Sequence, residues 1–175
     1  MLRRISSWTE EAGYSRINQK QVEKNLHGIG KFLSASDADV YFLQEVDLDS
    51  KRSFHINQQD FYAFGRNFLC DFVPYPLPPI GKVDSGILTL TGLQTSSSSR
   101  ISLPESFSWP VKTCNLKRCM LETRVPLEGT DAELVLLNFH LEAYDSGEGK
   151  IAQSKMLAEK LEEEYAARTF FLCSG

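Results

Sequence analysis

Apolar residues recur along this chain at two spacings, and each spacing predicts a different kind of element. Steps of three and four residues predict an amphipathic helix over about residues 17–33 and a second helix over about residues 148–167. The first helix has its apolar stripe at Val22, Leu26, Ile29 and Leu33. The second helix has on one side Ile151, Ser154, Ala158, Leu161 and Tyr165.

Short apolar runs and alternating positions predict the strands. The continuous run at residues 40–43 is typical of a strand with both faces buried. Strands are also predicted at residues 86–90, 120–125, 134–141 and 169–173. The polar residues 47–60 predict a loop or short helix, and the serine-rich residues 95–99 predict an exposed loop. This order indicates a sheet-rich core with helices on the outside.

Composition and charge narrow the functional classes only slightly. The 175 residues include 19 Lys and Arg and 23 Asp and Glu, for a formal net charge of −4. This balance argues against nucleic-acid binding by bulk electrostatics, but a nuclease remains open because a metal can supply local positive charge. No apolar run approaches the roughly 20 residues of a membrane span, and the N-terminus lacks the apolar stretch of a signal peptide. The cytoplasm is therefore the default location.

Glu45 is a candidate metal ligand because it comes straight after the predicted buried strand. A carboxylate at the C-terminal end of a core strand is held on a rigid element. Mg²⁺ takes one or two protein carboxylates and keeps several waters. The alternative is that Glu45 is a surface acid that ends a strand.

Four further residues are candidates for a phosphate-handling site. Asn138 and His140 share one face of the strand predicted at residues 134–141, so His140 is either a catalytic residue or a hydrogen-bonded core histidine. Asp84 would fix the tautomer of a neighbouring histidine and raise its pKa, or it is a turn aspartate before Ser-Gly. The guanidinium of Arg118 matches phosphate geometry, or Arg118 is a surface charge.

Four segments of the chain, taken together, resemble the endonuclease/exonuclease/phosphatase superfamily. Residues 39–47 (DVYFLQEVD) resemble its D-x-x-x-L-Q-E-V signature, and residues 136–141 (LLNFHL) resemble its N-T-H-L strand with Phe139 in place of Thr. Residues 83–88 (VDSGIL) resemble the acidic residue and strand of its deoxyribonuclease-like and sphingomyelinase-like branches. Residues 170–175 (FFLCSG) resemble the strand that leads into its G-D-x-N motif.

The resemblance implies a four-layer α/β/β/α sandwich of the α+β class and metal-dependent hydrolysis of a phosphoester. The implied cofactor is Mg²⁺ or another divalent cation such as Mn²⁺, with Glu45 as its ligand. His140 would contact the phosphate and help the leaving oxygen depart, with Asp84 as its orienting carboxylate. Arg118 and Asn138 are the candidate phosphate-binding residues. The substrate class stays open among nucleic acids, lipids, inositol phosphates and nucleotides.

The resemblance also implies segments that this sequence lacks. The superfamily has a first strand with a metal-proximal Asn, a D-x-N pair after the last strand and a later Asp-His segment. We therefore expect residues 1–175 to be the N-terminal portion of a domain, inactive on its own. Its uncovered sheet edges would favour self-association. The alternative is a non-enzymatic binding module that retains the fold.

Overall fold

The computed structural model describes residues 18–62, 69–74, 83–105, 107–110, 116–143 and 147–175. Its helices and strands follow the chain in the order α1 (Gln19–Ala35), β1 (Val40–Asp47), the 3₁₀ turn η1 (Lys51–Ser53), α2 (Gln59–Tyr62), β2 (Leu69–Pro74), β3 (Ser85–Thr91), β4 (Ser97–Ser102), β5 (Cys119–Pro126), β6 (Glu133–Phe139), α3 (Glu148–Ala166) and β7 (Phe170–Ser174). None of the helices in the described part of the chain combines the length and the apolar character that crossing a membrane requires.

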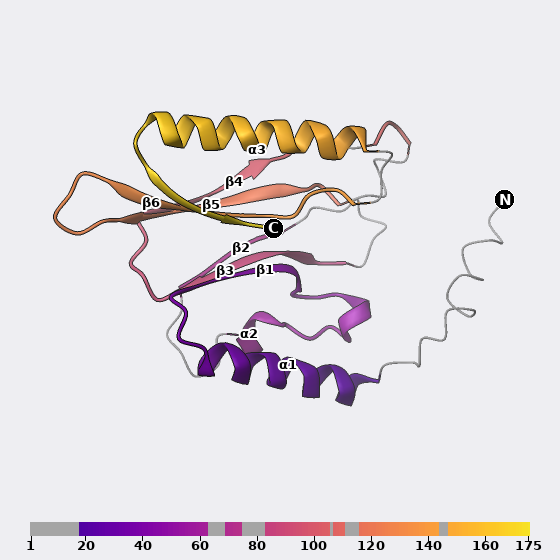
Figure 1. The fold of residues 1–175 in the computed structure, drawn as a ribbon. Coiled ribbons are helices and arrows are strands. Elements are labelled where there is room, and N and C mark those ends of the chain that lie inside the picture. Colours follow the sequence, from indigo (N-terminus) through magenta and orange to yellow (C-terminus); the bar gives the residue numbers. More distant parts are fainter. Residues whose placement is uncertain (1–17, 63–68, 75–82, 106, 111–115, 144–146) are drawn as a thin grey trace.

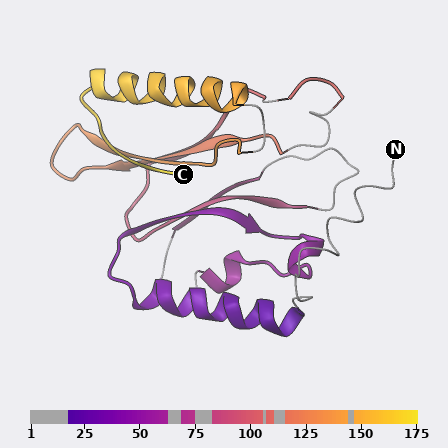
Figure 2. The same ribbon diagram turned by 45° about the vertical axis from the view of Figure 1, so that its right-hand side comes forward.

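The described elements form four layers. One sheet has the strand order β1-β3-β2 and the other has the order β4-β5-β6-β7. Helix α1 covers the outer face of the first sheet and α3 covers the outer face of the second (Figure 1), and the turned view shows the same stacking (Figure 2). All strand pairs are antiparallel except β6 and β7, which are parallel. The predicted α+β sandwich with α/β/β/α layers is confirmed.

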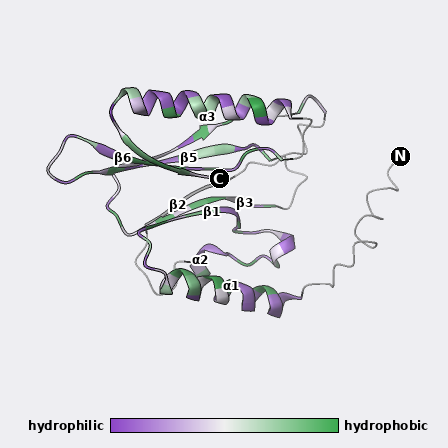
Figure 3. Ribbon diagram, in the orientation of Figure 1, coloured by the Kyte–Doolittle hydropathy of each residue, from purple (hydrophilic) through white to green (hydrophobic). Residues whose placement is uncertain are grey.

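Buried apolar side chains form two clusters, and hydrophobic residues are frequent along the strands (Figure 3). Beneath α1 the buried cluster consists of Leu26, Leu33, Val46, Tyr62, Leu88 and Leu90. Between the sheets Ile87 of β3 packs against Cys119 and Leu121 of β5. Successive side chains of a strand point to opposite faces, so β3 contributes to both clusters and fixes the first sheet between α1 and the second sheet.

Helix α3 packs on its sheet through charged side chains as well as half-buried apolar ones such as Leu157 and Leu161. Arg124 of β5 lies 2.6 Å from Glu164, and the Lys160 ammonium lies 2.8 Å from both Glu122 and Glu164. The predicted helix is confirmed, but Ile151 and Tyr165 are exposed. The reason is that β5 presents Glu122 and Arg124 to α3, so the helix turns its charged face inward.

Several local predictions differ from the structure. The predicted loop at residues 95–99 overlaps β4, an outer strand whose exposed serines pair with β5 through the backbone, and β2 was not predicted. The strand at residues 40–43 is confirmed, but it is half-buried rather than covered on both faces. The prediction of a loop or short helix at residues 47–60 is confirmed, since η1 lies there between loop residues and α2 begins there. His140 lies just beyond the end of β6 instead of inside the strand.

Candidate active site

A β-bulge near the end of β1 aims Glu45 at the second sheet. The pairing of β1 with β3 shifts between Leu43, opposite Leu88, and Val46, opposite Gly86. Gln44 and Glu45 of β1 therefore lie opposite a single residue of β3, as in a β-bulge. The backbone of Glu45 has a φ of 55°. A left-handed conformation costs a non-glycine residue about 1–3 kcal/mol, and in the described part of the chain Phe54, His55 and Arg168 adopt it as well.

The bulge lets two neighbouring side chains meet the same opposing strand. In a regular strand they would point to opposite faces. Here Gln44 Nε2 donates a hydrogen bond to Asn138 Oδ1 at 2.9 Å, and Glu45 Oε1 lies 3.2 Å from His140 Nε2. The structure thus brings together Glu45 and His140, which are 95 residues apart in sequence.

His140 lies in surroundings that favour its neutral form. Its side chain is 24% exposed. Burial and the positive charge of Arg118 lower the pKa of His140, and these effects outweigh the opposing influence of Glu45 and Glu142. The sequence predicted that a neighbouring carboxylate would raise this pKa; the structure reverses that direction because burial is the larger effect.

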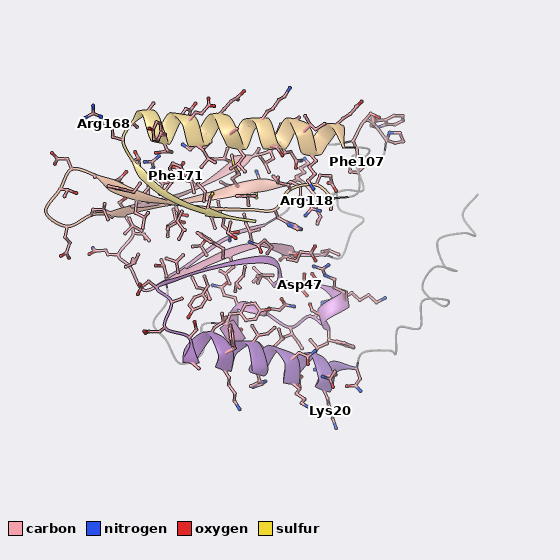
Figure 4. The ribbon with its side chains drawn as sticks, in the orientation of Figure 1. Lys20, Asp47, Phe107, Arg118, Arg168 and Phe171 are labelled. Atoms are coloured by element: carbon pink, nitrogen blue, oxygen red, sulfur yellow. The ribbon has the colours of Figure 1, made fainter. Side chains whose placement is uncertain are left out.

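Arg118 lies inside the molecule rather than on its surface. Its side chain is only 6% exposed, and its Nε lies 3.6 Å from Glu142 Oε2, which is equally buried. Asp47 and Arg118 lie at the same end of the two sheets (Figure 4). In this position the charge of Arg118 lowers the pKa of His140, and the predicted contact of Arg118 with a substrate phosphate stays a prediction.

Asn138 is fully buried between the sheets. Its Nδ2 donates to the carbonyl of Leu88 at 3.0 Å, and its Oδ1 accepts from Gln44. The predicted contact between Asn138 and a phosphate stays a prediction, and in this structure both ends of the amide are engaged between the sheets. The Asn138 amide links the second sheet to the first through Gln44, which is next to Glu45 in the chain.

Asp84 lies at the same end of the first sheet as Glu45 but does not pair with His140. It precedes β3, its carbonyl accepts from Leu48 N at 2.9 Å, and its backbone N–H donates to Ser50 Oγ at 3.0 Å. Its side chain is exposed, and within the described residues no hydrogen bond joins it to His140. The predicted Asp84–His140 hydrogen bond is corrected, since Glu45 approaches His140 Nε2 instead.

Two residues that the sequence did not single out complete the cluster. Asp47 is buried at the end of β1, and Arg52 of η1 reaches both Asp47 and Glu45. Asp47 and Arg52 both lie in the polar stretch of residues 47–60, where apolar residues do not recur at the spacing of a helix or a strand. The one available signal was the proximity of Asp47 to Glu45 in sequence.

Comparison with known proteins assigns the fold. No protein-family profile and no curated protein matches the sequence. Among solved structures, the human Nocturnin catalytic domain with bound sulfate is similar at 19% identity with a TM-score of 0.61, over 86% of this chain and 55% of that one. An endonuclease/exonuclease/phosphatase from Beutenbergia cavernae is similar at 20% identity with a TM-score of 0.57, over 77% and 38% of the two chains. This chain has the endonuclease/exonuclease/phosphatase superfamily fold.

A further match of the same superfamily fold is ANGEL2, described as a 2′,3′-cyclic phosphatase and bound to adenosine-2′,3′-vanadate. It is 17% identical with a TM-score of 0.55, over 84% of this chain and 45% of that one. The chain thus spans about half the length of the solved structures it matches.

The superfamily fold raises the question of whether the residues present fit a divalent cation. Among the described residues no three His, Cys, Asp or Glu side chains gather as a ready metal cage. Glu45, however, is 49% exposed, and the contacts to His140 and Arg52 leave part of its lone-pair capacity open. One half-exposed carboxylate fits Mg²⁺, which binds through one or two carboxylates and keeps its other ligands as water.

Proposed function

We propose that this chain forms part of a divalent-metal-dependent phosphoester hydrolase. The observation that carries the proposal is the meeting of Glu45 and His140 at 3.2 Å, from opposite sheets of a sandwich with this superfamily fold. A strained bulge serves to aim Glu45 there. The fold alone does not assign function, so the proposal rests on this pair of residues.

Each residue has a distinct part in the proposed reaction. Glu45 holds Mg²⁺ or Mn²⁺, which when bound supplies Lewis acidity toward a phosphoryl oxygen. His140 lies beside Glu45, where its ring would contact a phosphate oxygen and assist proton transfer at the leaving oxygen. Asn138 keeps the two sheets in register, so that Glu45 and His140 stay within reach of one substrate.

The proposal predicts that Glu45→Gln weakens metal binding. The amide removes the negative charge that a hard cation requires, and we expect the affinity for Mn²⁺ to fall about 10-fold or more. Titration calorimetry on the chain measures this. The matched control is Glu128→Gln, at an exposed glutamate in the turn between β5 and β6, which should bind Mn²⁺ as the wild type does.

Hydrolysis by the complete protein separates an enzyme from a binding module. With bis(4-nitrophenyl) phosphate as probe, we expect Glu45→Gln and His140→Ala each to lower turnover by about 10²-fold or more. If both variants retain wild-type metal affinity and turnover, the enzymatic proposal is wrong. The alternative of a non-enzymatic module with this fold would then be favoured.

A further inference from the structure

Three ionisable side chains from β1 and η1 form one connected cluster. The guanidinium of Arg52 donates from Nε to Asp47 Oδ2 at 2.9 Å and from its second terminal nitrogen to Asp47 Oδ1 at 2.9 Å. The other terminal nitrogen lies 3.5 Å from Glu45 Oε2. One guanidinium therefore links a buried carboxylate to the exposed carboxylate of the candidate metal ligand.

Asp47 fixes the orientation of Arg52. The Asp47 side chain is 3% exposed, and a buried carboxylate requires a hydrogen-bonded partner of opposite charge. Two parallel N–H···O bonds set the plane of the guanidinium as well as its position. Ser85 Oγ accepts a further bond from Arg52 at 3.2 Å, which leaves the group little rotational freedom.

The backbone that carries Arg52 is itself anchored to the first sheet. Before the turn, Ser50 Oγ exchanges hydrogen bonds with the backbone of Asp84. After it, the backbone N–H of Gln58 donates to the carbonyl of Asp47 at 2.9 Å, and the Gln58 side chain accepts from the backbone N–H of Asp47. The turn thus holds Arg52 at a fixed place beside the end of β1.

Glu45 needs such support more than an ordinary strand residue does. Its side chain is about half exposed and its backbone is in the left-handed region. His140 approaches one carboxylate oxygen and Arg52 approaches the other. The direct attraction between two half-exposed charges is worth little, so Arg52 adds little to the stability of the whole fold and acts locally, on the bulge and on the orientation of Glu45.

We propose that Arg52, held by the buried Asp47, is a positioning residue for Glu45. The inference rests on the proposed function of Glu45 as a metal ligand and deepens it. Ligating carboxylates generally depend on outer hydrogen-bond partners for their orientation, and loss of such a partner typically costs 10–100-fold in metal affinity. The two-pronged guanidinium is essential to this role, because an ammonium carries the same charge without the fixed geometry.

The test compares Arg52→Lys, Arg52→Met and Lys51→Met in the chain, with Mn²⁺ affinity measured by titration calorimetry. We expect both Arg52 variants to bind Mn²⁺ about 10-fold or more weakly than the wild type. Lys51→Met, one residue away on the same turn, is expected to bind as the wild type does. Wild-type affinity in Arg52→Lys would show that charge alone suffices and would overturn the proposal, as would wild-type affinity in Arg52→Met.

A metal-free measurement separates this inference from the proposed function. Amide hydrogen exchange at Glu45 and Val46 should be faster in Arg52→Lys than in the wild type, because the bulge loses a support. If the wild type binds no Mn²⁺, the proposed role of Glu45 fails, whatever the exchange rates are. If the wild type binds Mn²⁺ but exchange and affinity are unchanged in Arg52→Lys, only the positioning role fails. Should Arg52→Met not fold, Asp47→Asn, which keeps the shape but weakens the bidentate partner, is expected to reproduce the loss of affinity.

Discussion

The charge state of His140 is set by opposing influences from its surroundings. Burial and Arg118 disfavour the imidazolium, whereas Glu45 and Glu142 favour it, and the first pair prevails. Because the pKa is lower in the folded than in the unfolded protein, the folded state binds fewer protons. The neutral ring therefore contributes stability that is present above its ordinary pKa of 6.5 and is lost as the pH falls through the lowered value.

Replacing Arg118 by Met is expected to raise the pKa of His140. The substitution removes a positive charge and leaves Glu142 as an uncompensated negative charge, and both changes favour the imidazolium. Titration of the ring by NMR measures the shift. Arg118→Lys keeps the charge, so its His140 pKa should stay below the ordinary value. Arg168→Met, at an exposed arginine at the opposite end of the molecule (Figure 4), should leave the titration unchanged.

A double variant tests the same effect if Arg118→Met does not fold. Breaking a buried ion pair from one side costs about 3–5 kcal/mol. The double substitution Arg118→Met and Glu142→Gln leaves no lone buried charge. Since Arg118 has the larger influence on His140, the double variant should also raise the pKa. An unchanged or lower pKa in both variants would show that Arg118 does not set the charge of His140.

At the scale of elements, the sequence predicts the helices and strands that a local hydrophobic pattern defines. It does not predict features that depend on contacts with distant segments of the chain. Helix α1 and strands β1, β3 and β6 follow from apolar periodicity, and motif order predicts the sandwich. The bulge at Gln44 and Glu45 could not be predicted, because it exists only relative to the register of β3. The same holds for Arg52, whose partners Asp47 and Glu45 are assembled by the turn. Strand β4 was missed because an exposed edge strand needs no apolar residues.

The Gln44–Asn138 hydrogen bond links the two sheets, and its loss should destabilise the fold. Asn138→Leu keeps the approximate shape but leaves the Gln44 amide and the Leu88 carbonyl without their partner, at an expected cost of about 1–3 kcal/mol in the free energy of unfolding. Urea denaturation measures this cost. Adding Gln44→Leu to Asn138→Leu should cost less than the sum of the single changes. Full additivity, or no loss of stability in Asn138→Leu, would mean that the amide pair does not couple the sheets.

At the scale of the whole molecule, β7 is an outer edge of the second sheet with no further described strand beside it. In the described part of the chain β7 pairs with β6 alone, and all five of its residues are exposed. Phe170 is 62% exposed and Leu172 is 47% exposed, and both lie on the same face of the strand. An outer strand that presents both unpaired backbone groups and apolar side chains is a template for association with another copy.

We therefore expect the chain to self-associate through β7, and Leu172→Lys to shift it toward the monomer. A lysine on an edge strand opposes pairing by charge, and here it also removes apolar surface. Light scattering over a range of protein concentrations measures the apparent mass. The matched control is Phe32→Lys, which removes a 71% exposed aromatic side chain from α1, on the opposite outer layer. Helix α1 presents no unpaired strand edge, so Phe32→Lys should associate as the wild type does. A wild type that stays monomeric at all concentrations, or equal shifts in both variants, would show that β7 is not the surface of association.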